Sequence, residues 1–435
     1  MLKRVLVGVA AVVMLAGAAM AGPVEDAEAA YDRGDFVTAR TLLRPLADQG
    51  NAQAQMLLGY IYDNGKDVEP DHAEAIKWYR KAAEQGEANA QYHLGAIYHY
   101  GQGVAKDRVR AAKWFQKAAK QGQVYAQYEV GRLFQYGIGV PENLSYAIIW
   151  FKRAAEQGLA EAQYSLGIFY MPATVPDTPH EHANITEAAK WFLLAAEQSH
   201  AEAQIKIGEM HADGLGVLQD TAAAVNWFKL AAEQGHAKGM YGLALSYLNP
   251  EIKGIPKDKV QGHMWLNLAA SYGDRSAGRD RDGFAENMTA ESILRAQILA
   301  RNWRPKDGGK QKTNKDAVAL RIDAERGDDV AQWKLGEMYR SGRDFLQDFQ
   351  EAMTWYTRAA NHGNAAAQYA LGSIYTEATG VPQNYVAGHM WLNLAAAGGH
   401  HLAFKARNDL TELMTSDQVA EAQRLAREWK PEPEQ

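Results

Sequence analysis

Small and hydrophobic residues recur along this chain in a pattern that repeats about every 36 residues. Between residues 88 and 98 they follow the spacing of one face of an α-helix, and they do so again between residues 111 and 122. Gly101 to Val104 lies between the two segments and predicts a turn. A two-helix unit repeated at a fixed period is typical of a solenoid, in which each unit buries its hydrophobic face against its neighbours. We therefore expect an all-α chain of antiparallel helix pairs. A tryptophan in the second helix marks the units: Trp78, Trp114, Trp150, Trp191, Trp227, Trp265, Trp355 and Trp391.

Glycine occupies the middle of the first helix in most units, although it costs about 1 kcal/mol relative to alanine inside a helix. We expect this position to let the second helix approach closely, with the Ala-Ala pair after the tryptophan as the matching small surface. A second set of glycines follows the second helix and predicts left-handed caps, with Ser199 in place of one of them. The mid-helix glycines are Gly59, Gly95, Gly131, Gly167, Gly208, Gly336 and Gly372. The capping glycines are Gly86, Gly122, Gly158, Gly235, Gly273, Gly363 and Gly399.

The repeated motif reads Ala-x-Ala-Gln-x-x-Leu-Gly-x-x-Tyr, followed by Ala-x-x-Trp-Phe/Tyr-x-x-Ala-Ala-x-x-Gly. It closely resembles the Sel1-like repeat family, which is related to the tetratricopeptide repeat, and the resemblance extends from about residue 51 to residue 399. The resemblance implies a right-handed superhelical solenoid of antiparallel helix pairs that usually serves as a protein-binding adaptor. Residues 22–50 depart from the motif and are expected to form an N-terminal capping hairpin.

A longer repeat is superimposed on the first, because residues 262–270 recur letter for letter as residues 388–396. Charged helical sequence follows each copy, and we interpret it as a cap that closes a repeat stack. Thr415 and Gln418 have capping-box spacing before the last helix. Two arrays joined by a linker are therefore expected, with one continuous solenoid bent at the linker as the alternative. The expected segments are a signal peptide at 1–21, the hairpin at 22–50, six repeats at 51–273, a helical cap at 274–304, the linker at 305–315, a leading helix with two repeats at 316–399, and a second cap at 400–431.

The first 21 residues have the pattern of a secretory signal peptide, since Lys3 and Arg4 precede an apolar run that ends in small residues at Ala21. We expect cleavage after Ala21 and a periplasmic or secreted protein without a membrane span. An uncleaved anchor is the alternative, although the run is short and weakly hydrophobic. Cleavage changes the net charge from −6 to −8, which disfavours nucleic acid as a partner. The chain has no cysteine, which excludes disulfides, thiol chemistry and a cysteine-linked lipid anchor.

One position of the first helix is aromatic in six units, and an aromatic row on an inner groove can bind an extended peptide or stack on sugars. The competing and preferred interpretation is that these rings pack between adjacent repeats. The next position varies between units and is expected to face solvent, where partner selectivity would be set. The aromatic positions are Tyr92, Tyr128, Tyr164, Tyr241, Trp333 and Tyr369, and the variable positions are His93, Glu129, Ser165, Lys206 and Lys334.

Few residues point to metal binding or catalysis. His180 and His182 flank Glu181 in a proline-rich insertion and make a weak metal candidate, because no third ligand with motif spacing adjoins them. A surface loop that contacts a partner is the preferred interpretation of this insertion. His263 and His389 are duplicates of each other, and we interpret them as structural.

These observations predict an exported, non-enzymatic adaptor that binds another protein or peptide in a bacterial cell envelope and needs no cofactor. A carbohydrate- or peptidoglycan-binding module that uses the aromatic row is the alternative. A cell-wall or β-lactam hydrolase is the least favoured function, because none of the ten serines is followed three residues later by lysine.

Overall fold

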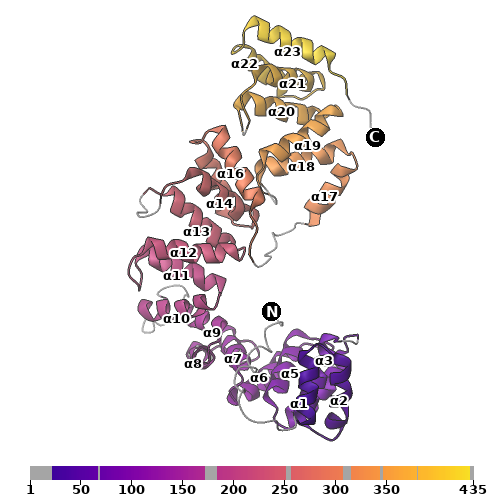
Figure 1. Ribbon diagram of the computed structural model, residues 1–435, viewed down its shortest axis with the longest axis vertical. Helices are drawn as coiled ribbons and strands as arrows, with labels where there is room; N and C mark the ends of the chain where they lie inside the picture. Colours follow the sequence, from indigo (N-terminus) through magenta and orange to yellow (C-terminus); the bar gives the residue numbers. More distant parts are fainter. Residues whose placement is uncertain are drawn as a thin grey trace. The chain divides into compact units, whose positions relative to one another are not determined.

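The structure is a computed structural model, and it describes residues 22–66, 69–171, 184–250, 256–306, 315–342, 346–379 and 381–431. Within these ranges the chain forms helices and turns and has no strand (Figure 1). The expected all-α fold built from helix pairs is therefore confirmed. Contacts divide the chain into two compact units, residues 1–166 and residues 167–435. The expected signal peptide at residues 1–21 lies outside the described residues.

The first unit begins with a helical hairpin in the segment where the sequence departs from the repeat motif. Gly34 makes its turn with a φ of 80°, and Asp35 begins the second helix by accepting a hydrogen bond from the Thr38 amide at 3.1 Å. First and second helices of the repeats then alternate. The helices are α1 Pro23–Asp32, α2 Phe36–Asp48, α3 Ala52–Asn64, α4 His72–Glu84, α5 Ala88–Tyr100, α6 Arg108–Lys120, α7 Val124–Tyr136, α8 Leu144–Glu156 and α9 Ala160–Tyr170, the last of which crosses the boundary between the units.

The second unit continues this alternation and contains two sets of three helices, α14–α16 and α21–α23, that correspond across the duplication found in the sequence. The last helix of each set begins after Thr289 or Thr415, as predicted, and Thr415 forms the expected capping box with Gln418. The helices are α10 Ile185–Glu197, α11 Ala201–Asp213, α12 Thr221–Glu233, α13 Ala237–Leu248, α14 Lys259–Ser271, α15 Arg275–Ala285, α16 Ala290–Asn302, α17 Lys315–Glu325, α18 Asp329–Ser341, α19 Phe349–Asn361, α20 Ala365–Glu377, α21 Tyr385–Ala397, α22 Ala403–Thr411 and α23 Ser416–Glu428.

The described helices are also too short or too polar to cross a lipid bilayer. The left-handed caps after the second helices are present as predicted. Gly122 has a φ of 93°, and Ser199 adopts a φ of 64° at the position where other units have glycine.

Six of the seven mid-helix glycines admit an aromatic ring, whereas Gly372 admits Leu392, and this corrects one expectation. A Cβ atom at Gly95 would lie 2.6 Å from Cδ1 of Phe115, and one at Gly131 would lie 2.7 Å from Cδ1 of Phe151. The close approach of the second helix is therefore confirmed, but the contacting group is the aromatic residue after the tryptophan. The expectation that the Ala-Ala pair fills this space was wrong, because at these positions the large ring packs directly on the glycine backbone.

A ladder of buried glutamine side chains connects successive repeats. The amide of Gln91 donates to the Ala83 carbonyl at 3.0 Å, and its oxygen accepts from the Gln121 amide at 2.8 Å. Gln127 makes the same pair of bonds with Ala119 and Gln157. The Gln of the Ala-x-Ala-Gln motif thus ties the first helix of one unit to second helices of two units, which explains why a polar residue recurs at a buried position.

Replacing Gln91 with methionine is expected to lower the free energy of unfolding by about 1 to 3 kcal/mol, because the buried Ala83 carbonyl then loses its partner. Urea unfolding of the chain followed by circular dichroism measures the effect. Gln102→Met, at an exposed glutamine, is the matched control. Equal stability of the two variants would show that the ladder contributes nothing.

Candidate functional site

The aromatic row lies half-buried along the first helices. In the first unit the Tyr92 ring lies 5.7 Å from the Phe115 ring and 6.1 Å from the Tyr125 ring, and Tyr128 lies 5.6 Å from Phe151. In the second unit Tyr369 stacks on His400 at 4.2 Å. Each of these rings packs against a neighbouring helix, or in the case of Tyr369 against the turn after α21, and leaves part of its surface accessible. Tyr164, Tyr241 and Trp333 are half-buried as well.

Three phenol groups of the row, those of Tyr92, Tyr128 and Tyr241, are held in their neutral form. Burial raises the pKa of Tyr92 and of Tyr128. The hydrogen bond that the Tyr241 hydroxyl donates to Asp280 at 2.6 Å, together with burial, raises the pKa of Tyr241 to about 12. These three residues therefore offer neutral rings and hydroxyl groups to a ligand.

His93 was expected to face solvent, and this expectation was wrong. Its side chain is only 5% exposed. It stacks on Tyr79 at 4.9 Å and contacts the rings of Tyr60 and Tyr92 at 5.7 and 5.5 Å. Burial lowers the pKa of His93 to about 4, so the imidazole is neutral and packs as an aromatic side chain.

The other variable positions differ from one another. Lys334 is exposed, whereas Ser165 and Lys206 are half-buried, and Lys206 pairs with Glu209 at 2.8 Å. Glu129 is half-buried and lies 3.3 Å from Arg132, one turn farther along α7. Burial raises the pKa of Glu129 despite the opposing effect of Arg132.

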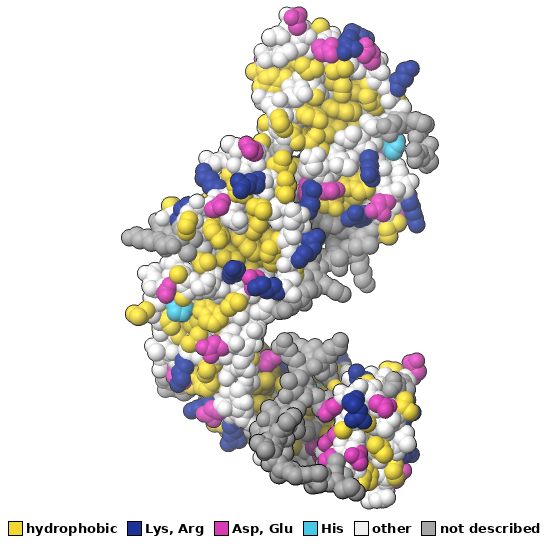
Figure 2. Space-filling view, in the orientation of Figure 1, with side chains coloured by type: hydrophobic (Ala, Val, Ile, Leu, Met, Phe, Trp, Pro, Cys, Tyr) yellow, Lys and Arg dark blue, Asp and Glu magenta, His cyan; other side chains and the backbone are white. Residues whose placement is uncertain are grey.

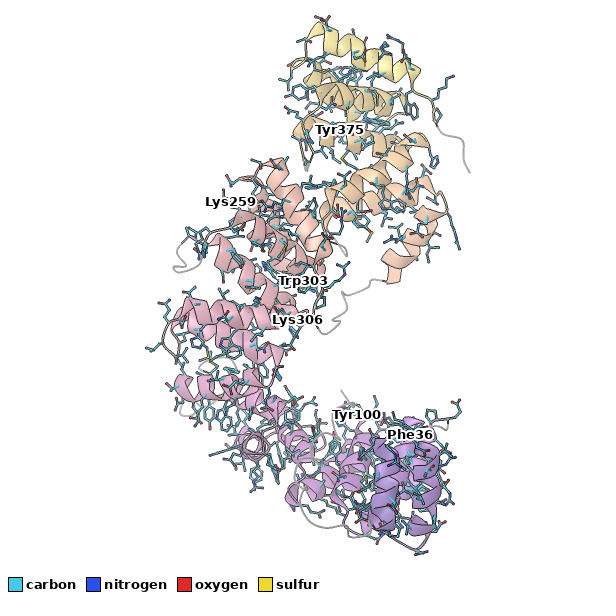
Figure 3. The ribbon with its side chains drawn as sticks, viewed as in Figure 1. Phe36, Tyr100, Lys259, Trp303, Lys306 and Tyr375 are labelled. Carbon is cyan, nitrogen blue, oxygen red and sulfur yellow. The ribbon has the colours of Figure 1, made fainter. Side chains whose placement is uncertain are left out.

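A surface in the first unit brings several of these groups together, and we call it the α5–α7 surface. The charge of Arg132 interacts with Glu129, Tyr100, Tyr128 and Tyr136. Tyr100 and Tyr136 are the last residues of α5 and α7, and their side chains are 54% and 60% exposed. Tyr100 projects at the surface of this unit (Figure 3). The α5–α7 surface consists of Tyr92, Tyr100, Tyr128, Glu129, Arg132 and Tyr136.

Tyr100 and Tyr136 did not emerge from the sequence analysis. The sequence feature that could have identified them is that each tyrosine directly precedes a glycine that ends a first helix. These glycines, Gly101 and Gly137, are left-handed. In other units this position holds smaller or acidic residues, for example Asn64 and Asp213. The exposed tyrosines are therefore a local feature of two units in the first half of the chain.

In the second unit the first helices border an open hollow of about 890 Å³ between α11, α12 and α13. Tyr241 and Lys238 of α13 and Glu209 and Asp213 of α11 line it, and Phe228 contributes an apolar wall. This places Tyr241, a member of the aromatic row, at a concave site with charges of both signs.

A basic hollow was also missed from the sequence. Arg80 and Arg110 donate hydrogen bonds to the Tyr98 hydroxyl at 3.2 and 3.3 Å, and Lys113 and Lys117 line the same hollow. Burial alone would raise the pKa of Tyr98, but the hydrogen bonds and charges of the two arginines lower it. Arg80, Arg110, Lys113 and Lys117 come from the second helices α4 and α6, and Tyr98 comes from α5.

The histidines give no metal site in the described part of the chain. No group of three or more His, Asp or Glu side chains there is arranged to hold a metal ion. His180 and His182 lie outside the described residues. His263 is fully buried, and burial together with the charge of Arg281 lowers its pKa to about 4; its duplicate His389 is buried too.

The buried histidines predict a loss of stability in acid. The pKa of His93 lies near 4 in the folded chain and near 6.5 in the unfolded chain, so the unfolded chain binds the proton first as the pH falls. The contribution of neutral His93 to the free energy of unfolding is complete above pH 6.5 and is lost as the pH falls towards 4. At pH 5 we expect a loss on the order of 2 kcal/mol relative to pH 7 from His93 alone.

His93→Phe is expected to remove this part of the pH dependence, because phenylalanine fills the same aromatic site without titrating. Urea unfolding at pH 7 and pH 5 measures it. His401→Phe, at an exposed histidine, serves as the control. An unchanged pH dependence in His93→Phe would contradict the neutral, buried assignment.

Comparison with known proteins agrees with the repeat pattern. The Sel1 repeat family model matches residues 52–87, 88–123, 124–159, 160–200, 201–236, 237–274, 329–364 and 365–400. The chain is similar to a solved Sel1 repeat protein from Oxalobacter formigenes, with 33% identity over 58% of this chain and 98% of that chain and a TM-score of 0.50.

It is also similar to a protective antigen of uropathogenic Escherichia coli strains that displays an SLR fold, with 27% identity over 94% of this chain and 92% of that chain and a TM-score of 0.46. None of the curated proteins compared with the chain matches it. Because the eight matched segments together span more than half of the sequence, the chain belongs to the Sel1 repeat family, whose repeats generally serve as scaffolds for protein–protein interaction.

Proposed function

We propose that this protein is an exported, non-enzymatic scaffold that binds another protein or a peptide in a bacterial cell envelope. The observation that carries the proposal is the α5–α7 surface, where Tyr100 and Tyr136 expose their rings beside the Glu129–Arg132 pair. Tyrosine and arginine are enriched among the residues that contribute most to protein interfaces. Their rings supply a large contact area, and the neutral hydroxyl groups supply directional hydrogen bonds.

The exported location rests on the amino-acid sequence of residues 1–21, which has the pattern of a cleaved signal peptide. N-terminal sequencing of the protein isolated from its native cells tests this part. The proposal expects a mature chain that starts at Gly22 in the periplasmic or extracellular fraction. A chain that retains Met1 in the cytoplasmic fraction would refute export.

A pulldown from envelope extract under mild crosslinking tests the binding surface. The bait is the mature chain, and the test variant is Tyr100→Ala/Tyr136→Ala. Tyr146→Ala is the matched control, since Tyr146 is 53% exposed but lies on a second helix. We expect a stoichiometric protein partner that the control retains and that the test variant loses by at least about tenfold, corresponding to 1.4 kcal/mol. Equal recovery by both variants would place the binding surface elsewhere.

A carbohydrate- or peptidoglycan-binding module is the second candidate, because exposed aromatic rings also stack on sugars. Sedimentation of the chain with insoluble peptidoglycan distinguishes the two functions. Cosedimentation that depends on Tyr100 and Tyr136, without a protein partner in the pulldown, would favour the glycan. Turnover of a chromogenic β-lactam or a muropeptide by the purified chain would refute the non-enzymatic assignment.

A further inference from the structure

Four polar side chains of α14–α16 form a socket that binds another part of the same chain, and we call it the first socket. It consists of Asn267, Arg281, Gln297 and Arg301. The first three are at most 2% exposed. The bound segment is the start of α19 and the residues before it, 346–349, which lie within the same unit.

The socket recognises the backbone of this segment and one carboxylate. Asn267 donates to the Gln347 carbonyl at 2.7 Å and accepts from the Gln347 amide at 2.7 Å. Arg301 donates from Nε to Oδ2 of Asp348 at 2.7 Å. Oδ1 of Asp348 meanwhile accepts hydrogen bonds from the first amides of α19.

The remaining members complete the socket. Gln297 accepts from the Phe349 amide at 3.1 Å, and Arg281 donates to the Ser341 carbonyl at 2.9 Å. Leu346 packs against the hydrophobic cluster of these helices, which includes Trp265, Leu268, Ala296 and Ala300. The socket thus takes a Leu-Gln-Asp sequence at the beginning of a second helix.

The duplication reproduces this socket at the C-terminal end of the chain. The residues 126 positions later are Asn393, Arg407, Gln423 and Arg427, identical at all four positions, and we call them the second socket. Arg407 donates to Asn393 at 2.9 Å, as Arg281 does to Asn267 at 3.3 Å. Trp265, Leu268, Ala296 and Ala300 form the apolar floor of the first socket. The residues 126 positions later are again identical and form the apolar floor of the second socket: Trp391, Leu394, Ala422 and Ala426.

The second socket is open where the first is covered. Gln423 and Arg427 are exposed, and Asn393 and Arg407 are half-buried. On the face seen in Figure 2, hydrophobic side chains gather over the helices near the C-terminal end of this unit, where α20–α23 lie. Leu402, Phe404 and Leu413 of this region are exposed. In the described part of the chain, no segment therefore covers the second socket as residues 346–349 cover the first.

The sequence Leu-Gln-Asp occurs once more in the chain, as Leu218, Gln219 and Asp220 before α12. Leu218 is 89% exposed, and Gln219 and Asp220 are exposed too. The local geometry matches that of residues 346–348. The side-chain amide of Gln219 donates to the Ala212 carbonyl, seven residues earlier, at 2.8 Å. The side-chain amide of Gln347 likewise donates to the Arg340 carbonyl at 3.0 Å. Asp220 caps α12 by accepting a hydrogen bond through Oδ1, as Asp348 caps α19.

We propose that the second socket of one chain binds residues 218–220 of a second copy of the same chain. Arg427 complements the Asp220 carboxylate as Arg301 complements Asp348 in the first socket, and the apolar floor accepts Leu218 as the first socket accepts Leu346. Each chain carries one open socket and one exposed Leu-Gln-Asp segment at different places, so the contact is head-to-tail and chains can add in succession.

Sedimentation velocity of the mature chain tests the proposal with two single variants and their mixture. Arg427→Glu removes the charge partner in the socket, and Leu218→Asp removes the side chain that the floor accepts. Both positions are exposed, so neither change is expected to disturb the fold. Lys405→Glu makes the same charge change at an exposed position of α22 outside the socket.

We expect the wild type and Lys405→Glu to associate at about 100 μM, a concentration at which a micromolar contact is saturated. Each of the other two variants alone should be monomeric. Their equimolar mixture should form a dimer and nothing larger, because the Leu218→Asp chain keeps an intact socket and the Arg427→Glu chain keeps an intact segment. A monomeric wild type, association that survives in either variant, or a mixture that stays monomeric would each overturn the proposal.

Discussion

Replacing Arg281 with alanine is expected to lower the free energy of unfolding of the second unit by about 2 to 5 kcal/mol, because it removes a large buried side chain and leaves a cavity together with a carbonyl group that has lost its donor. Arg281 is 1% exposed and donates to Asn267, Asp282 and the Ser341 carbonyl. Without it, the Ser341 carbonyl loses a buried donor, and a cavity opens between α15 and the end of α18. Urea unfolding at low micromolar concentration, followed by circular dichroism, measures the change.

The duplication supplies a matched control for this experiment. Arg407 holds the same place in α22 and donates to Asn393 and Asn408, but it is half-buried with no covering segment of the described chain over it. Arg407→Ala is therefore expected to cost less than about 1 kcal/mol. Similar losses in the two variants would mean that the contact with residue 341 and residues 346–349 does not stabilise the second unit.

Replacing Phe115 with alanine is expected to cost about 3 to 5 kcal/mol, because it removes a buried ring and leaves a cavity above Gly95. The Phe115 side chain is 2% exposed, and its ring edge would lie 2.6 Å from a Cβ atom at Gly95. Thermal or urea unfolding measures the loss.

Gly95→Ala tests that contact, because its effect on the free energy of unfolding should be destabilising when residue 115 is phenylalanine and stabilising when residue 115 is alanine. In the wild type the added methyl group meets the ring, and overpacking of this kind costs about 1 to 3 kcal/mol. In Phe115→Ala the space is empty, and the substitution should stabilise by up to about 1 kcal/mol through its helix propensity. A double-mutant cycle with additive effects would contradict the direct packing of ring on glycine.

The local elements of this fold were predictable because each has a short-range cause. Helix pairs followed from the spacing of small and hydrophobic residues, and the cap at Ser199 followed from its place in a series of glycines. The close approach at Gly95 was also predictable, whereas its partner was not. Which side chain of a second helix fills such a space depends on the rotation of the two packed helices about their axes. The motif contains both Phe115 and the Ala-Ala pair, and it does not distinguish which of them faces Gly95.

The functional surface was only partly predictable. Tyr92 and Tyr128 were identified from their recurrence, but the exposure of Tyr100 and Tyr136 depends on where the first helices end. His93 was misjudged because its position is variable between repeats, and only the three-dimensional structure shows the tyrosines that enclose it. The bonds between Asn267 and Gln347 join residues 80 positions apart, and no local pattern marks them.

Site-specific photocrosslinking in the native cells tests the central claim most directly. A benzophenone side chain is placed at residue 136, on the α5–α7 surface, and at residue 146, on a second helix of the same unit. The proposed scaffold function predicts one discrete protein adduct in the envelope fraction from position 136 and none from position 146. Adducts at neither position, or the same adducts at both, would contradict it.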